Sequence, residues 1–353
     1  MSDSNIGGEA SILEERRRKL EELRDQNIAY INDFVPTHHS KELHDSHGHL
    51  SKEELESKKI NNLSVAGRVV LKRVMGNASF VTIRDGSGDI QAYITKNNLD
   101  PDLYKNFKTW DLGDIIGIEG NLFKTKTDEL TIEAQSITLI TKALRPMPEK
   151  HKGLVDVEIK YRQRYLDLMS SPESKSIFEK RSQIISSVRS SMLSDGFLEV
   201  ETPMMHSIPG GAVARPFVTQ HNALDRELFL RIAPELHLKR LLVGGFEKVF
   251  EINRSFRNEG LSTKHNPEFT MLEFYAAFAT FNGTLAFTQN IIQSASEAIG
   301  NKKEIEWDGE KIDLSSFSTK SLSELVLEYN PKLTDADLTN LDNLRAFAES
   351  IKI

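Results

Sequence analysis

The stretch from Phe246 to Ala277, which reads FEKVFEINRSFRNEGLSTKHNPEFTMLEFYAA, is the most informative part of the chain. An alternating run from Val249 to Arg254 predicts a strand, and a second run from Phe269 to Tyr275 predicts its return. The chain reverses between them through Asn258-Glu259-Gly260. We therefore expect a two-stranded hairpin here.

The predicted hairpin carries more charge than a plain turn requires. Its charged residues are Arg254, Arg257, Glu259, Lys264, His265, Glu268 and Glu273. Arginine offers a planar fork of donors that matches phosphate or carboxylate, and an aromatic ring can stack on a base. Two interpretations are open: a solvated charged hairpin, or a binding site for a polyanion over a sheet.

The order of the residues favours the binding site. Phe256-Arg257-Asn258-Glu259, His265-Asn266-Pro267-Glu268-Phe269 and Glu273 follow one another as they do in motif 2 of class II aminoacyl-tRNA synthetases. The stretch resembles the lysyl members of that class, and the resemblance extends from about residue 12 to Ile353. It implies a lysine–tRNA ligase that uses ATP and Mg2+ to convert L-lysine to lysyl-adenylate and then transfers lysine to tRNA(Lys).

The resemblance also implies a role for individual residues. Arg257 is the expected catalytic residue, bridging the lysine carboxylate and the α-phosphate of ATP, where negative charge develops. The predicted ATP contacts are Arg257, Glu259, His265, Asn266 and Phe269. The predicted lysine contacts are Gly211, Glu235, Arg257, Glu273 and Tyr275.

The acidic residues of this set indicate which amino acid the site would bind. Glu273 and Tyr275 lie two apart on a predicted strand, so they share a face and can present acceptors to an ammonium group or to magnesium. An aspartyl or asparaginyl synthetase has the same two-domain plan, but its pocket must bind a side-chain carboxylate or amide. Glu235, Glu273 and Tyr275 favour lysine. The helix predicted over 236–242 carries Lys239 and Arg240, which we expect at the surface or facing RNA.

Residues 1–61 are predicted to be a helical extension and a linker. A helix is expected over Ile12–Ile31, and its basic residues are interpreted either as a solvated face or as a contact to an RNA backbone. Five of the ten histidines follow in 36–50, namely His38, His39, His44, His47 and His49. Their spacing favours an exposed linker over a metal site.

Residues 62–145 change to strand patterns. Five strands are predicted, over Leu63–Val74, Ala78–Arg84, Asp89–Thr95, Asp114–Thr125 and Glu129–Leu139. A helix over Asp102–Trp110 after the third strand gives the order of an OB-fold barrel, which binds single-stranded nucleic acid. The resemblance implies that this barrel holds the anticodon, through Arg73, Phe80 and Gln91. Tyr93 and Phe123 are further candidates for stacking or for filling the barrel.

The remainder is predicted to be a linker over 146–160 and a class II catalytic domain over 161–353. We expect an α+β fold in which helices flank a mixed, mainly antiparallel sheet. The helix over Pro172–Ser194 and the strand over Gly196–Pro203 resemble motif 1 of the class, which implies a homodimer.

One part of the class pattern is not found in the sequence. The glycine-rich motif 3, with its arginine for the γ-phosphate, has no match, and helices are predicted over 284–299, 322–328 and 341–351. We therefore expect a fragment with an incomplete catalytic sheet, inactive alone, whose metal ligands lie beyond Ile353. The alternative from another class is a noncatalytic RNA-binding protein derived from a synthetase.

The composition restricts the cellular compartment and the partners that can be expected. The absence of cysteine excludes disulfides and thiolate metal sites. No apolar run approaches the roughly 20 residues that span a bilayer, and the N-terminus lacks the apolar core of a signal peptide. These features predict a cytoplasmic protein without a membrane partner. The formal net charge of −7 argues against nonspecific affinity for nucleic acid.

Overall fold

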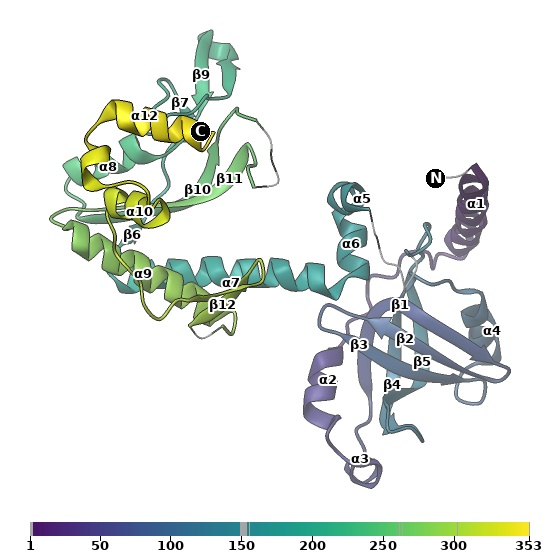
Figure 1. The fold of residues 1–353 in the computed structure, drawn as a ribbon. Coiled ribbons are helices and arrows are strands. Elements are labelled where there is room, and N and C mark those ends of the chain that lie inside the picture. The colour runs from purple at the N-terminus through teal and green to yellow at the C-terminus, as the bar shows by residue number, and fades with distance from the viewer. Residues whose placement is uncertain are drawn as a thin grey trace. The chain divides into compact units, whose positions relative to one another are not determined.

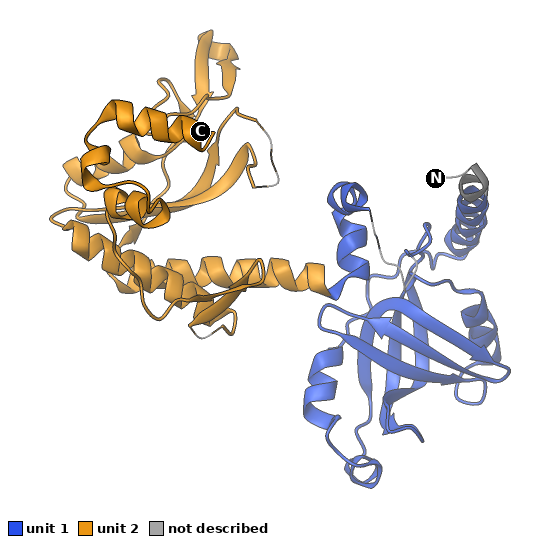
Figure 2. Ribbon diagram, in the orientation of Figure 1, with its two compact units in different colours: residues 1–172 blue, residues 173–353 orange. Residues whose placement is uncertain are grey.

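The structure is a computed structural model that describes residues 3–148, 154, 156–260, 262, 264–301 and 303–352. It separates into two compact units, Met1–Pro172 and Glu173–Ile353 (Figures 1 and 2). Of the predicted linker over 146–160, residues 149–153 and 155 lie outside the described residues. The helices that follow, α5 (Val157–Arg162) and α6 (Arg164–Ser170), group with the first unit.

The first unit is built on a closed five-stranded barrel with the strand order β1-β2-β3-β5-β4. The strands are β1 (Leu63–Met75), β2 (Ala78–Arg84), β3 (Asp89–Thr95), β4 (Ile115–Lys124) and β5 (Leu130–Thr141). A helix, α4 (Pro101–Thr109), lies between β3 and β4 in the chain. The predicted OB-fold order is confirmed, because β3 closes the barrel on β5 in parallel while the other pairs are antiparallel.

Alternation along the strands separates the barrel interior from its outer face. On β2 the side chains of Val81 and Ile83 are fully buried, and on β3 those of Ala92 and Ile94 are fully buried. The residues between them are half-exposed and point outward, as the period of two in a strand requires. The interior along these strands is therefore aliphatic apart from the buried Ser79, and the aromatic residues of β2 and β3 lie on the outer face.

The histidine-rich segment was predicted to be an exposed linker, and this prediction is wrong over most of its length. Residues Ser40–His47 form a helix, α2, and a second helix, α3, spans Lys52–Lys58. Leu43 and Leu50 are buried in the barrel core. The apolar residues of this segment thus close the barrel, while the histidines stay partly or fully exposed around them.

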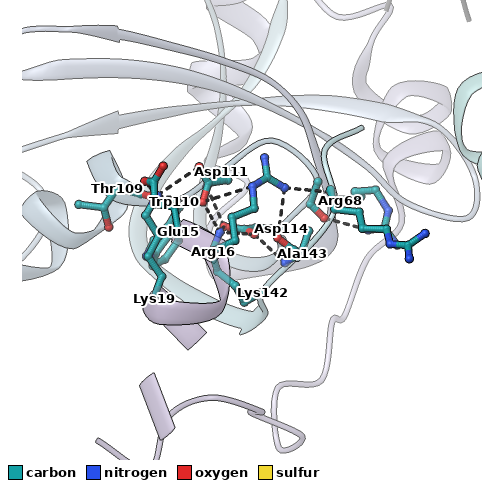
Figure 3. A network of polar contacts seen from close by, with 12 residues as sticks. Glu15, Arg16, Lys19, Arg68, Thr109, Trp110, Asp111, Asp114, Lys142 and Ala143 are labelled. Carbon is teal, nitrogen blue, oxygen red and sulfur yellow. Dashed lines mark hydrogen bonds and ion pairs between the residues drawn. The ribbon is translucent and has the colours of Figure 1, made fainter. Parts of the chain in front are cut away.

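The N-terminal helix is joined to the barrel by a network of charged groups (Figure 3). This helix, α1, spans Asp3–Asp25 rather than the predicted Ile12–Ile31. Arg16 donates to the carbonyls of Ala143 and Arg145 at 3.1 and 2.9 Å, and the Lys19 ammonium contacts a carboxylate oxygen of Asp111 at 3.1 Å. Some of the basic residues of α1 therefore bind protein, and neither a purely solvated face nor an RNA contact describes them.

The second unit is organised on the predicted hairpin, whose strands are β10 (Lys248–Phe256) and β11 (Glu268–Ala276). A short strand, β6 (Leu198–Glu199), adds in parallel to β10 and is all that forms of the strand predicted over 196–203. Helices α7 (Pro172–Ser194) and α9 (Phe281–Ala298) pack on this sheet through Met192, Phe250 and Ile291 (Figure 1).

The other elements of the second unit surround this sheet. A three-stranded sheet has the order β7-β9-β8, with η1 (Asn222–Leu224) before β9 and α8 (Glu235–Val243) after it. Its strands are β7 (Met205–His206), β8 (Val218–His221) and β9 (Arg226–Leu230). A hairpin that was not predicted and three short helices complete the unit: β12 (Glu304–Trp307), β13 (Glu310–Asp313), α10 (Leu322–Tyr329), α11 (Asp335–Leu338) and α12 (Leu341–Ser350). Within the described residues, no helix combines the length and apolar character needed to cross a membrane.

Candidate functional site

One face of strand β11 carries three of the predicted substrate residues. The register sets Glu251 opposite Glu273 and Ser255 opposite Phe269. Because side chains alternate along a strand, Phe269, Glu273 and Tyr275 lie on the same face of β11. The ring predicted for adenine and the acceptors predicted for lysine are therefore presented in one row.

The predicted ATP contacts surround a cavity of about 290 Å³ at the open end of the hairpin. Its lining consists of Arg257, Glu259, Gly260, Lys264, His265, Asn266, Pro267 and Phe269. The guanidinium of Arg257 lies 5.2 Å from the centre of the Phe269 ring. The Nδ1 atom of His265 lies 2.7 Å from the hydroxyl of Ser262. The structure thus brings together all five residues predicted for ATP.

Arg257 is held by its backbone and left with an unused donor. Its N–H donates to the carbonyl of Pro267 at 2.8 Å, which closes the loop between the two strands. Its side-chain Nε is buried and has no hydrogen-bond partner among the described residues. A buried donor without an acceptor is unfavourable, so this atom suits an anionic oxygen supplied by a ligand.

Gly211 and Glu235 form a second group, at the start of α8. Gly211 has a φ of +89°, a conformation that other residues rarely adopt. A Cβ atom at this position would lie 3.0 Å from the Cβ of Glu235 and 3.2 Å from that of Ala233. The glycine therefore allows its backbone to approach Glu235 closely, which brings two of the predicted lysine contacts next to each other.

Glu273 and Tyr275 are joined directly. The Tyr275 hydroxyl donates to the Glu273 carboxylate at 2.6 Å. Burial raises the pKa of Glu273, and the nearby carboxylate of Glu235 raises it further. Burial and the hydrogen bond to Glu273 likewise raise the pKa of Tyr275. Two carboxylates and a protonated phenol at one place form a site that a cation would stabilise.

Two charged contacts around this site were missed from the sequence. Arg231 and Glu251 are each 1% exposed in their side chains and pair at 2.7 Å, so they lock the end of β9 to β10. The only sequence signal is a single charge in an apolar run. Lys239 lies at the surface, as expected, with 53% of its side chain exposed, and its ammonium also lies 2.5 Å from the Glu235 carboxylate, a contact that was not predicted. The Glu–Lys spacing of four residues could have indicated this pair.

The residues predicted for the anticodon lie on the outer face of the barrel. Phe80 on β2 is opposite Arg73 on β1 and Tyr93 on β3. The Phe80 and Tyr93 rings are 5.0 Å apart, and the Tyr93 and Phe123 rings are 6.0 Å apart. Gln91 continues the same face and donates to the Thr131 hydroxyl at 2.9 Å. Tyr93 and Phe123 thus line the surface with Phe80 and do not fill the barrel.

This aromatic face borders a shallow cavity of about 580 Å³. Phe80, Tyr93, Phe123 and Lys126 are among its lining residues. Two other basic residues of β1 are engaged with the protein itself. Arg68 donates to the carbonyl of Gly113 at 2.8 Å. Lys72 donates to three carbonyls at the end of α4, and burial lowers its pKa to about 8.

The described residues contain no group of three or more His, Cys, Asp or Glu side chains placed to hold a metal ion. The Mg2+ that the resemblance implies would therefore have to be held by fewer protein groups, such as one or two carboxylates together with the phosphates of ATP.

A five-stranded barrel with an aromatic outer face, joined in one chain to a sheet whose hairpin carries an arginine, an aromatic ring and carboxylates, has the plan of a class II aminoacyl-tRNA synthetase. Comparison with family models agrees. Residues 156–344 match the tRNA synthetases class II (D, K and N), and residues 63–140 match the OB-fold nucleic acid binding domain. The chain belongs to this class II synthetase family.

Its relatives point to one member of the family. The chain is 52% identical over 339 residues to the lysine–tRNA ligase of Cupriavidus metallidurans, covering 96% of this chain and 66% of that protein. It is 52% identical over 338 residues to the lysine–tRNA ligase of Neisseria meningitidis serogroup B, with 96% and 67% covered. The lysine–tRNA ligase of Azoarcus sp. is 51% identical over 362 residues, with 100% and 72% covered. The chain spans about two thirds of the length of the first two relatives.

Proposed function

We propose that the protein is a lysine–tRNA ligase, which activates L-lysine with ATP and transfers it to tRNA(Lys). The observation that carries this proposal is the shared face of β11, where Phe269 lies in line with the acceptors Glu273 and Tyr275. This row supports a binding place for adenine beside one for an ammonium group. The names of the relatives support the same assignment.

In the proposed reaction, Arg257 binds the lysine carboxylate and the α-phosphate of ATP together. Its buried, unpaired Nε supports this role. Holding both groups in one geometry replaces a bimolecular encounter, and the guanidinium offsets the charge that develops at phosphorus. Glu259 accepts from the adenine amino group, His265 reaches the distal phosphates, and Asn266 helps to hold the base.

Lysine is held at both ends in this proposal. Gly211 and Glu235 accept from the α-ammonium, and Glu273 with Tyr275 accepts from the side-chain ammonium. The acidity of this group favours lysine over aspartate or asparagine, whose enzymes belong to the same family. Mg2+ would neutralise phosphate charge when bound.

We propose further that the barrel binds the tRNA(Lys) anticodon through Arg73, Phe80 and Gln91, and that the protein is a homodimer. A protein that charges tRNA works where translation takes place, so we place it in the cytoplasm. Residues 1–353 taken alone are expected to activate lysine poorly, because the glycine-rich motif for the γ-phosphate is not found among them.

ATP–pyrophosphate exchange on the protein as it occurs naturally tests the function. Lysine should drive the exchange, and aspartate or asparagine should not. Exchange driven by either of the latter would overturn the lysine assignment. Tight tRNA binding without any ATP binding would instead favour a noncatalytic RNA-binding protein.

A further inference from the structure

The ammonium group of Lys239 occupies the predicted lysine site of the protein itself. Lys239 lies one turn after Glu235 on α8, and its Nζ is 2.5 Å from the Glu235 carboxylate. The same Nζ lies 5.6 Å from the centre of the Tyr275 ring. It therefore contacts the acceptor proposed for the α-ammonium and faces the ring of an acceptor proposed for the side-chain ammonium.

This placement has a simple electrostatic cause. The Glu235 carboxylate lies close enough to Glu273 and Tyr275 to raise the pKa of both, and the buried Glu251 carboxylate is already paired with Arg231. Without a substrate, Glu235 has no other cation bonded to it among the described residues. Lys239 supplies one from within the helix, and it carries the same four-carbon stem and primary ammonium as free lysine.

The Lys239 contact is weak enough to be exchanged. The side chains of Lys239 and Glu235 are 53% and 29% exposed, so water screens their attraction. The contact is also a helical pair spaced four residues apart, which is among the weaker ionic interactions. A substrate that brings its own ammonium to Glu235 can therefore replace Lys239, which swings into water.

We infer that Lys239 is an internal competitor of the substrate: it neutralises Glu235 in the free protein and must be displaced before the α-ammonium of lysine binds. This inference rests on the proposed function, because Glu235 is taken as the α-ammonium acceptor. Lys239 would thus be a specificity-determining residue that sets how tightly lysine binds, and it would take no part in the chemistry of activation.

Lysine binding to variants of the natural protein tests this, with calorimetry for the Kd and ATP–pyrophosphate exchange for kcat and KM. Lys239→Met removes the competing charge and should lower the Kd and the KM for lysine about three- to tenfold, with kcat unchanged. Lys239→Arg retains a competing cation and should stay within about twofold of the unsubstituted protein. Arg240→Met removes the same charge from the next position of α8 and should change neither constant.

Each other result would overturn the inference. An unchanged Kd in Lys239→Met would make the pair an ordinary surface contact. A weaker Kd would mean that Lys239 positions Glu235 for the substrate. Equal tightening in Arg240→Met would assign the effect to long-range charge. If the unsubstituted protein binds no lysine, the proposed function fails and this inference fails with it, whereas the first three results leave the proposed function intact.

Discussion

Glu273 shows how one side chain can serve binding at a cost to folding. Burial raises its pKa above the ordinary value of 4.5, and the hydrogen bond from Tyr275 only partly opposes this. Only the ionised carboxylate attracts an ammonium group. Lysine affinity should therefore be lost as the pH falls through this raised pKa, at a higher pH than an ordinary glutamate would give. Calorimetric titration with lysine at a series of pH values measures this pH dependence of the Kd. The Glu273→Gln variant should bind lysine about ten- to a hundredfold more weakly, and its Kd should not show the loss of affinity at low pH that comes from Glu273.

The ionisation of Glu273 that favours lysine binding should disfavour folding. A carboxyl group with a raised folded-state pKa contributes stability below its unfolded pKa and loses it as the pH rises through the folded value. At neutral pH the empty site therefore carries an unfavourable charge. Glu273→Gln should unfold at the same or a higher temperature while binding lysine worse. A clear fall in Tm at neutral pH would contradict this account of Glu273.

Phe80 allows a similar test on the barrel. Its ring lies 5.0 Å from that of Tyr93 on a half-exposed face, so Phe80→Leu keeps apolar bulk and removes a stacking surface. Loss of base stacking costs about 1–3 kcal/mol, so affinity for the tRNA(Lys) anticodon stem-loop should fall about five- to hundredfold. Filter binding with a matched loop that lacks the anticodon bases provides the control. That loop should bind both proteins equally, and an equal loss on both loops would exclude stacking by Phe80.

At the scale of elements, part of the fold could be predicted from the sequence. The bounds of β2 and β3 were predicted to the residue, because strict alternation and good turn residues such as Asp85-Gly86-Ser87-Gly88 mark both ends. Helix α2 was missed for a physical reason. Its histidines resemble a polar linker, and the burial that orders it comes from Leu43 and Leu50 meeting the barrel core, which is a tertiary effect.

The candidate site was likewise only partly predictable from the sequence. Five residues could be proposed for ATP from the sequence because they follow one another in a single motif, and the structure gathers them around one cavity. Lys239 was not found, since a glutamate and a lysine four residues apart are common on solvated helices. The Arg231 pair was not found because its partner, Glu251, lies 20 residues away on β10, and only the tertiary fold brings the two together.

Asp85 links two elements and makes a prediction about the barrel. Its carboxylate accepts from the backbone N–H of Ser40 at 2.6 Å, at the start of α2, and from Ser87 and Gly88 in the turn before β3. Burial opposes ionisation, yet these hydrogen bonds lower its pKa to about 2. A lowered folded-state pKa gives stability that is present above the unfolded value of 3.8 and lost as the pH falls through 2.

Replacing Asp85 should therefore loosen α2 and remove part of the acid sensitivity. Asp85→Asn should lower the free energy of opening of the α2 amides by about 1–3 kcal/mol near neutral pH, measured by hydrogen exchange. The deficit should shrink between about pH 4 and pH 2, because the natural carboxylate is then protonated as well. Asp45→Asn, an exposed site on the same helix, should exchange like the natural protein. A deficit that persists at pH 2 would argue against the carboxylate as its source.

At the scale of the whole molecule, α7 carries an apolar stripe that the second unit only partly covers. Ile177, Ile184 and Val188 recur on one face of the helix at intervals of seven and four residues. Val188 packs against the core of the unit, whereas Ile177 is 65% exposed. Exposed apolar side chains that continue a buried stripe favour contact with a further protein surface.

In the proposed homodimer the second subunit would cover this stripe, and the dimer can be tested without measuring catalysis. Ile177→Lys places a charge on the uncovered stripe, so the natural protein should sediment as a dimer and the variant as a monomer at the same micromolar concentration. Gln183→Lys adds the same charge on a different face of α7, at an exposed position, and should remain dimeric. Sedimentation velocity reports both species, and circular dichroism checks that each variant keeps its helix. A dimeric Ile177→Lys variant, or a natural protein that is monomeric throughout, would refute an interface on α7.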